Sequence, residues 1–177
     1  ATDRRRWEDD LNLETSWDLR AKAAARLIPA GSKVLDIGCG AMSLERFLPI
    51  GCRYAPVDLV ARDERTIECD LNDGDFPDTS RADVLVLLGV LEYVADVEDL
   101  LKKLRRTERP VVLSYGPADA IEGDRRRELG WFNDFGLAEF QTLLARAGFS
   151  VRIRDHEVPP NVIFSLAPTD LATPALF

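Results

Sequence analysis

The stretch that decides the fold is VLDIGCG, residues 34–40. An apolar run ends in two glycines, and residues 43–48 then show the apolar spacing of a helix. Glycine lets a ligand approach the backbone closely, and open α/β sheets bind ligands at the carboxyl ends of their strands. The stretch therefore predicts a strand, a ligand-binding turn and a helix. Taken alone, it is also compatible with a plain tight turn.

Apolar runs and helical patterns alternate along the rest of the chain, which is typical of an α/β sheet. Strands are predicted at 33–37, 53–58, 66–69, 84–88, 110–115, 149–153 and 162–166, and helices at 15–28, at 43–48, after Asp96 and at 137–147. The run 84–88 is continuously apolar, as in a parallel strand covered on both faces. No helix separates the last two strands, so they are expected to be antiparallel.

The composition limits the class of protein. With 177 residues the chain is expected to form one domain, 15–177, preceded by an N-terminal extension, 1–14. Its 23 basic and 31 acidic residues give a net charge of −8, which disfavours nucleic acid and anionic membranes as partners. Three cysteines without a CxxC pattern and a single histidine, His156, predict reduced thiols, a cytoplasmic protein and no metal site. No apolar run is long enough to span a membrane, and no signal peptide is recognisable.

Aspartates follow three successive predicted strands. Asp36 precedes the glycine turn, Asp58 ends the second strand and Asp70 follows the third. A carboxylate after the second strand can accept hydrogen bonds from both hydroxyls of a ribose, and one after the third could accept from the exocyclic amine of adenine. Each aspartate alone is more typical of a turn or a helix cap, but three at matching positions indicate a nucleoside site.

With these residues in place, the sequence resembles the class I S-adenosylmethionine (SAM)-dependent methyltransferases. The resemblance covers about residues 17–166 and rests on 34–40, on Asp58, on Asp70-Leu71 and on LLGVLEY at 87–93, which is similar to the segment that lines the methionine part of the cofactor. It implies a single-domain, Rossmann-like α/β fold. The expected sheet is seven-stranded and mostly parallel, in the order 3-2-1-4-5-7-6, with an antiparallel last strand and helices on both faces.

The resemblance also implies SAM as cofactor and S-adenosylhomocysteine (SAH) as product. The implied cofactor-binding residues are Asp36, Gly38, Cys39, Gly40, Asp58, Leu59, Asp70, Leu71, Leu88 and Gly89. Two positions depart from the family pattern: Met42 stands where a third glycine is common, and Glu92 where a histidine is common. They support an alternative, a non-catalytic cofactor-binding or scaffold module. A dinucleotide site is a further alternative, but it would need glycine where Ser43 stands.

The expected activity is methyl transfer to a small molecule, such as a sugar or another metabolite. Glu92 and Tyr115 are expected where a catalytic base could act, and 118–136 is expected to form a mobile lid over the acceptor. Three lid residues are expected to contact the acceptor: Arg125, Trp131 and Asn133. The arginine runs 4–6 and 125–127 are otherwise expected to be solvated surface. His156 is also expected at the surface, whereas Trp17 is expected to pack over the sheet and cover the cofactor. The sequence indicates no oligomeric state.

Overall fold

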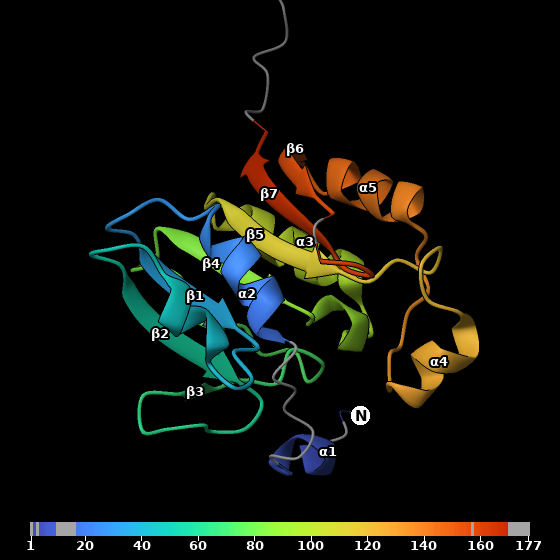
Figure 1. Cartoon of the computed structure of the whole chain (residues 1–177), viewed down its shortest axis with the longest axis horizontal. Helices are drawn as coiled ribbons and strands as arrows, with labels where there is room; N and C mark the ends of the chain where they lie inside the picture. Colours follow the sequence, from blue (N-terminus) through green and yellow to red (C-terminus); the bar gives the residue numbers. More distant parts are fainter. Residues whose placement is uncertain (1, 3, 10–16, 157, 170–177) are drawn as a thin grey trace, which may run out of the picture.

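The structure is a computed structural model that describes residues 2, 4–9, 17–156 and 158–169. A central sheet carries helices on both faces (Figure 1). The helices are α1 (Arg4–Glu8), α2 (Trp17–Ala25), α3 (Val97–Arg106), α4 (Gly123–Glu128) and α5 (Leu137–Arg146), with 3-10 helices η2 (Ser43–Phe47) and η3 (Leu91–Tyr93). The strands are β1 (Lys33–Ile37), β2 (Arg53–Asp58), β3 (Ile67–Glu68), β4 (Val84–Leu88), β5 (Val111–Tyr115), β6 (Phe149–Asp155) and β7 (Val162–Pro168).

The sheet has the order β3-β2-β1-β4-β5-β7-β6, as predicted. Neighbours from β3 to β5 pair in parallel, whereas β7 runs antiparallel to both β5 and β6. Insertion of an antiparallel strand between β5 and β6 distinguishes this sheet from the dinucleotide-binding order, 3-2-1-4-5-6. The parallel strands place the turns that follow β1, β2, β3 and β4 along one edge of the sheet.

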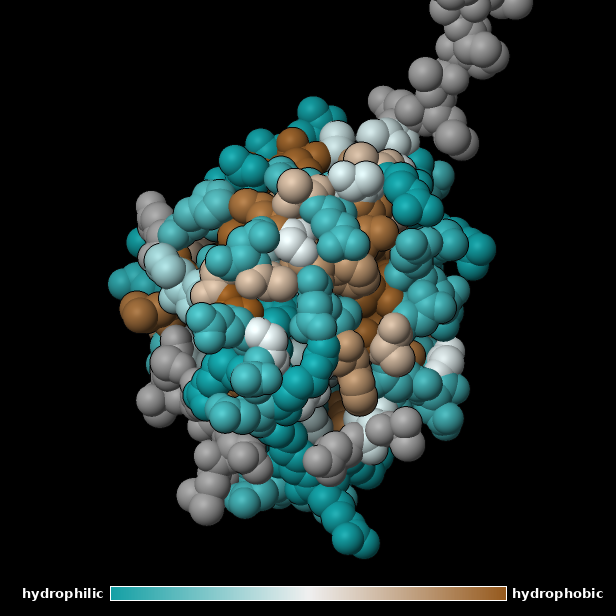
Figure 2. Space-filling model, turned by 90° about the vertical axis from the view of Figure 1, so that its right-hand side faces the viewer, coloured by the Kyte–Doolittle hydropathy of each residue, from teal (hydrophilic) through white to brown (hydrophobic). Residues whose placement is uncertain are grey.

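Two apolar cores lie on the two faces of the sheet. In β4, Leu85 and Leu87 belong to the core beneath α3 and α5, whereas Val84 and Val86 belong to the core beneath α2 and η2. This alternation explains why the strand is apolar throughout, because each side chain is buried on one face or the other. The side of the molecule around α4 and α5 is mostly hydrophilic, with an apolar band through its middle (Figure 2).

Local differences from the predicted elements have physical causes. Residues 43–47 form a 3-10 helix in place of the predicted α-helix, and Met42 before it is left-handed, with φ 53°. Strand β3 has only two residues, both exposed at the edge of the sheet. Three short helices, α1, η3 and α4, have no predicted counterpart, because a helix of so few residues is too short to produce a periodic apolar pattern. The predicted capping residues Thr15 and Ser16 and the proposed boundary between residues 14 and 15 lie outside the described residues.

Candidate functional site

A cavity of about 670 Å³ opens at the carboxyl ends of the parallel strands. All ten residues that the resemblance implies as cofactor-binding line this cavity: Asp36, Gly38, Cys39, Gly40, Asp58, Leu59, Asp70, Leu71, Leu88 and Gly89. Trp17, at the start of α2, also lines it. The topology thus gathers into one cavity residues that are spread over more than fifty positions of the sequence.

The glycine turn after β1 is tightly enclosed. Gly38 and Gly40 are left-handed, with φ 78° and 51°. A Cβ atom on Gly38 would lie 2.3 Å from Cγ2 of Val90, and one on Gly40 would lie 2.9 Å from the Trp17 ring. The turn therefore requires glycine at both positions for conformation and for space. Met42, at the place of the third glycine, does not line the cavity, so its bulk does not narrow it.

Asp58, at the end of β2, is buried against this turn. Its Oδ2 accepts a hydrogen bond of 2.7 Å from the Gly40 N–H. Its Oδ1 is 3.4 Å from the Val60 nitrogen and 3.5 Å from Nη2 of Arg62, both long contacts. One oxygen therefore holds the turn, while the other keeps capacity to accept hydrogen bonds from a ligand. A carboxylate oxygen in this position could accept hydrogen bonds from the ribose hydroxyls of a nucleoside.

Asp36 lies on β1 and is buried beside the turn. The Tyr54 hydroxyl donates a hydrogen bond of 2.7 Å to its Oδ2. Burial raises the pKa of Asp36 to about 7; the Tyr54 hydrogen bond and the charge of Arg20 oppose the shift, and the nearby Asp58 adds to it. Asp36 therefore titrates near neutral pH and can be ionised by a cationic ligand group.

The N-terminal segment closes one side of the cavity. The Thr2 hydroxyl donates to Oδ1 of Asp70 at 2.7 Å, and Nη1 of Arg62 donates to the Trp7 carbonyl at 2.8 Å. Thr2, Arg6 and Trp7 line the cavity. The expectation that the run 4–6 is only solvated surface is therefore wrong for Arg6. No signal in this short run predicts its position.

Arg20, on α2, is a site residue that sequence reasoning missed. Its guanidinium lies over the Trp17 ring at 5.6 Å, and its Nη1 is 2.6 Å from where a Cβ on Gly89 would lie. Its charge lowers the pKa values of Asp36 and Glu92, against the larger effect of burial. The sequence of α2 carries almost no amphipathic periodicity, so no local signal marks the face on which Arg20 lies.

Glu92 and Tyr115, the expected base positions, do not line the cavity. Glu92 is completely buried; its Oε1 accepts from the Gly116 N–H at 2.8 Å, and its Oε2 has no hydrogen-bond partner in the described part of the chain. Burial raises the pKa of Glu92. The Tyr115 hydroxyl donates to Oδ1 of Asn133 at 2.6 Å and accepts from Arg126 and from the Phe135 N–H. Burial raises the pKa of Tyr115 to about 12, so the phenol stays protonated at neutral pH.

The segment 118–136 is held down by a buried arginine, Arg126. Its guanidinium donates to the carbonyls of Gly116 and Asn133 and to Oδ1 of Asp134, and it lies 4.7 Å from the Trp131 ring centroid. The expectation of a solvated run is therefore wrong for Arg126, which is fully buried.

Of the expected acceptor contacts, Arg125 and Trp131 line the cavity, but Asn133 does not. The Asn133 amide instead donates to the carbonyls of Leu91 and Val94.

The sequence model of a family described as "Methyltransferase domain" matches residues 5–152. The chain belongs to this methyltransferase family. A comparison with curated proteins finds no match.

Solved structures share the methyltransferase fold at low sequence identity. A chain of the complex between the Haloferax volcanii Trm112 methyltransferase activator and a candidate methyltransferase is 16% identical, with a TM-score of 0.74 and coverage of 94% of this chain and 97% of that chain. A Burkholderia thailandensis 1,6-didemethyltoxoflavin-N1-methyltransferase, with bound 1,6-didemethyltoxoflavin and SAH, is 20% identical (TM-score 0.67; 92% and 82% covered). Human N-acetylserotonin methyltransferase, in complex with SAM, is 17% identical (TM-score 0.67; 93% and 56% covered).

Other reactive groups of this methyltransferase are unremarkable. Burial raises the pKa of the Cys39 thiol, and it raises that of Cys69 to about 11, so neither is a thiolate at neutral pH. His156 is exposed and does not line the cavity. Over the described ranges, no cluster of three or more His, Cys, Asp or Glu could hold a metal ion, and no helix is long and apolar enough to cross a membrane.

Asp36 should make the stability of the ligand-free protein depend on pH. Between its ordinary pKa of 3.8 and the folded-state value of about 7, the folded state keeps a proton that the unfolded state has lost, so stability falls as pH rises through this range. Asp36→Asn removes the titration. Urea unfolding should show a larger free-energy gain of the variant over the wild type at pH 8 than at pH 5. Equal differences at both pH values would show that Asp36 does not titrate in this range.

Arg126 should be the main stabiliser of the segment 118–136. Arg126→Met leaves buried acceptors without donors and should lower the free energy of unfolding by about 3 kcal/mol. Arg127→Met, one residue away and half exposed, should cost less than about 1 kcal/mol. Urea unfolding gives the energies, and limited proteolysis should cut the first variant between 118 and 136. Equal losses in the two variants would contradict the anchoring role.

Proposed function

We propose that this methyltransferase binds SAM in the cavity and transfers its methyl group to a small-molecule acceptor, leaving SAH. The observation that carries the proposal is that Asp36, Asp58 and Asp70 line one cavity together with the glycine turn. Two structural neighbours are described with SAH and with SAM bound, which supports the same cofactor here.

Different residues of the cavity would bind different parts of the cofactor. Asp58 would hold the ribose hydroxyls, Asp70 and Leu71 would lie at the adenine, and Asp36 would pair with the amino group of the methionine moiety. Leu88 and Gly89 would line the methionine part, and Arg20, beside Gly89, would hold its carboxylate. Arg62 is 3.5 Å from Asp58 and would give way to the ribose, because so long a contact is weak.

Held by these residues, SAM would supply an activated methyl group on a positively charged sulfur, to be transferred to a lone pair of the acceptor with SAH as the leaving group. Catalysis can then rest mainly on alignment of the acceptor. Glu92 and Tyr115 act as positioning residues in this proposal, since both are bonded to the loop that follows β5 and neither reaches the cavity. A proton released from a hydroxyl acceptor would pass to solvent.

The segment 118–136 would close over the acceptor, with Trp131 and Arg125 toward it. Arg126, which lies on α4, anchors the segment to the Gly116 carbonyl. The segment would therefore have to open while that arginine stays in place. Residues 1–14 would be an extension, of whose described residues Thr2, Arg6 and Trp7 line the cavity.

The second candidate is a non-catalytic cofactor-binding module. One observation favours it: neither expected base reaches the cavity. Incubation with SAM and a panel of phenols, amines and sugars distinguishes the two, because an enzyme forms methylated product and SAH, whereas a binding module forms neither.

Asp58→Ala should weaken SAH binding at least about tenfold, because Asp58 would lose charge-assisted bonds to the ribose. Asp83→Ala is the matched control: Asp83 lies at the amino end of β4, where it accepts from the Lys33 N–H, and its loss should leave SAH affinity within about twofold. Calorimetry measures both, and thermal melting checks folding. Asp58→Asn, which keeps an acceptor for Gly40, tests the charge alone. Equal affinities for the Asp58→Ala and Asp83→Ala variants would mean that the ribose site lies elsewhere.

A further inference from the structure

The two ends of the cavity differ in their charged side chains. At the sheet, the lining carries both signs, with Asp36, Asp58 and Asp70 beside Arg20 and Arg62. Away from the sheet, α1, η3, the segment 118–136 and residues 158–161 contribute Arg6 and Arg125 but no aspartate or glutamate among the described lining residues. We name this second part the acceptor end. Its positive charge is notable in a chain whose net charge is −8.

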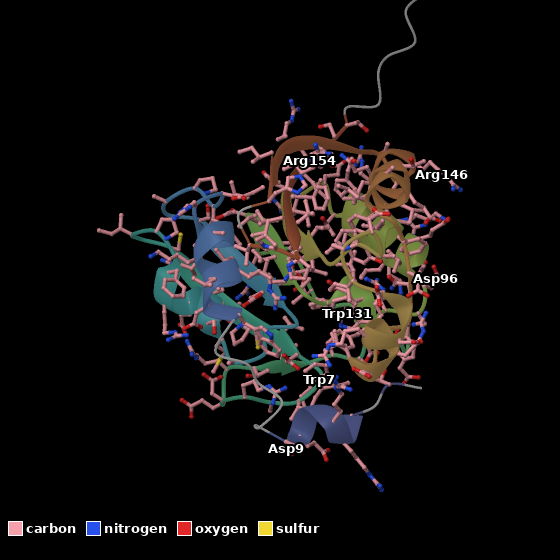
Figure 3. The ribbon with its side chains drawn as sticks, turned by 45° about the vertical axis from the view of Figure 1, so that its right-hand side comes forward. Trp7, Asp9, Asp96, Trp131, Arg146 and Arg154 are labelled. Atoms are coloured by element: carbon pink, nitrogen blue, oxygen red, sulfur yellow. The ribbon has the colours of Figure 1, made fainter. Side chains whose placement is uncertain are left out.

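An aromatic wall leads from the glycine turn to the acceptor end. Trp17, over Gly40, lies 6.5 Å from Trp7 between ring centroids. Trp7 meets Tyr93 at 5.0 Å, and Tyr93 meets Trp131 at 6.4 Å, both edge to face. Figure 3 shows Trp7 and Trp131 close together, reaching from α1 and from the chain after α4. A wall of this kind favours a flat, ring-shaped ligand.

Two arginines, Arg6 and Arg125, line the same cavity as that wall. Arg6 lies on α1. Its Nη1 is 3.0 Å from the position that a Cβ atom on Gly130 would take, and Gly130 directly precedes Trp131. Arg125 lies on α4, and its ion pair with Glu128 at 2.9 Å has both side chains about two-thirds exposed, so it is weak and easily exchanged. Guanidinium groups bind carboxylates through paired, charge-assisted hydrogen bonds. The site would thus pair ring stacking with anion recognition.

We propose that the acceptor is a planar aromatic molecule that carries a carboxylate or a similar anion. Its ring lies against Trp7, Tyr93 and Trp131, and its anion faces Arg6 and Arg125. The proposal rests on the proposed function, because it names the substrate class of the same cavity. It also replaces the sugar considered from the sequence, since a sugar presents many hydroxyl donors and the acceptor end offers no carboxylate to accept from them.

The test uses salicylate, its neutral counterpart salicylamide and methyl glucoside, titrated by calorimetry into the whole protein with and without SAH. Salicylate should bind at least about tenfold tighter than salicylamide, and methyl glucoside should not bind. The double variant Arg6→Gln/Arg125→Gln should lose most of the preference for salicylate and keep SAH affinity within about twofold. Arg125→Gln alone should lose part of it, which covers the case in which the double variant does not fold.

The matched control is Arg5→Gln/Arg146→Gln, which removes the same charge. Arg5 lies on α1 without lining the cavity, and Arg146 lies on the outer surface (Figure 3). This control should keep the preference. Equal binding of salicylate and salicylamide, tighter binding of methyl glucoside, or an unchanged preference in both Arg125 variants would overturn the proposal. Absence of SAH binding would contradict the proposed function separately, because the preference is also read without SAH.

Discussion

The hydrogen bond from the Gly40 N–H to the Asp58 carboxylate, 2.7 Å long, is the contact on which the rest of the site depends. It joins the turn after β1 to the end of β2. The Gly38 and Cys39 N–H groups also donate to the Val57 carbonyl, so the whole turn is folded onto β2. These bonds fix the turn against β2. Trp17 and Val90 pack against the turn at distances that only glycine allows.

A second constraint holds the acceptor end. Arg126 on α4 donates to the Tyr115 hydroxyl of β5, and this hydroxyl donates to Asn133. Asn133, in the chain after α4, also donates to the Leu91 carbonyl of η3. Tyr115 in turn stacks on Phe140 of α5 at 4.2 Å, within the core beneath the sheet. The position of Trp131 at the cavity is therefore set by the core, through a chain of buried polar contacts. Such networks are stable only when their groups are satisfied, which fits the complete burial of Arg126.

The sequence predicts the order of the sheet and the meeting of three aspartates in one cavity, and the reason is physical. Strands such as β4 are marked by apolar runs, and parallel strands bring Asp36, Asp58 and Asp70 to one edge without any further information. The acceptor end follows from contacts between distant segments, which no local pattern encodes. Thus Arg6 reaches the cavity from a five-residue helix, and Arg126 is buried while its neighbour Arg125 faces the cavity. For the same reason the sequence wrongly places Asn133 at the acceptor, whereas its amide donates to the backbone carbonyls of Leu91 and Val94.

The central claim is that the cavity at the strand ends is a SAM site organised by Asp58. A crystal structure of the protein with SAH tests it most directly. The ribose hydroxyls should lie within hydrogen-bonding distance of Asp58, with Arg62 moved away from that carboxylate and the adenine beside Asp70 and Leu71. A structure in which SAH lies elsewhere, or in which the ribose does not touch Asp58, would contradict the claim.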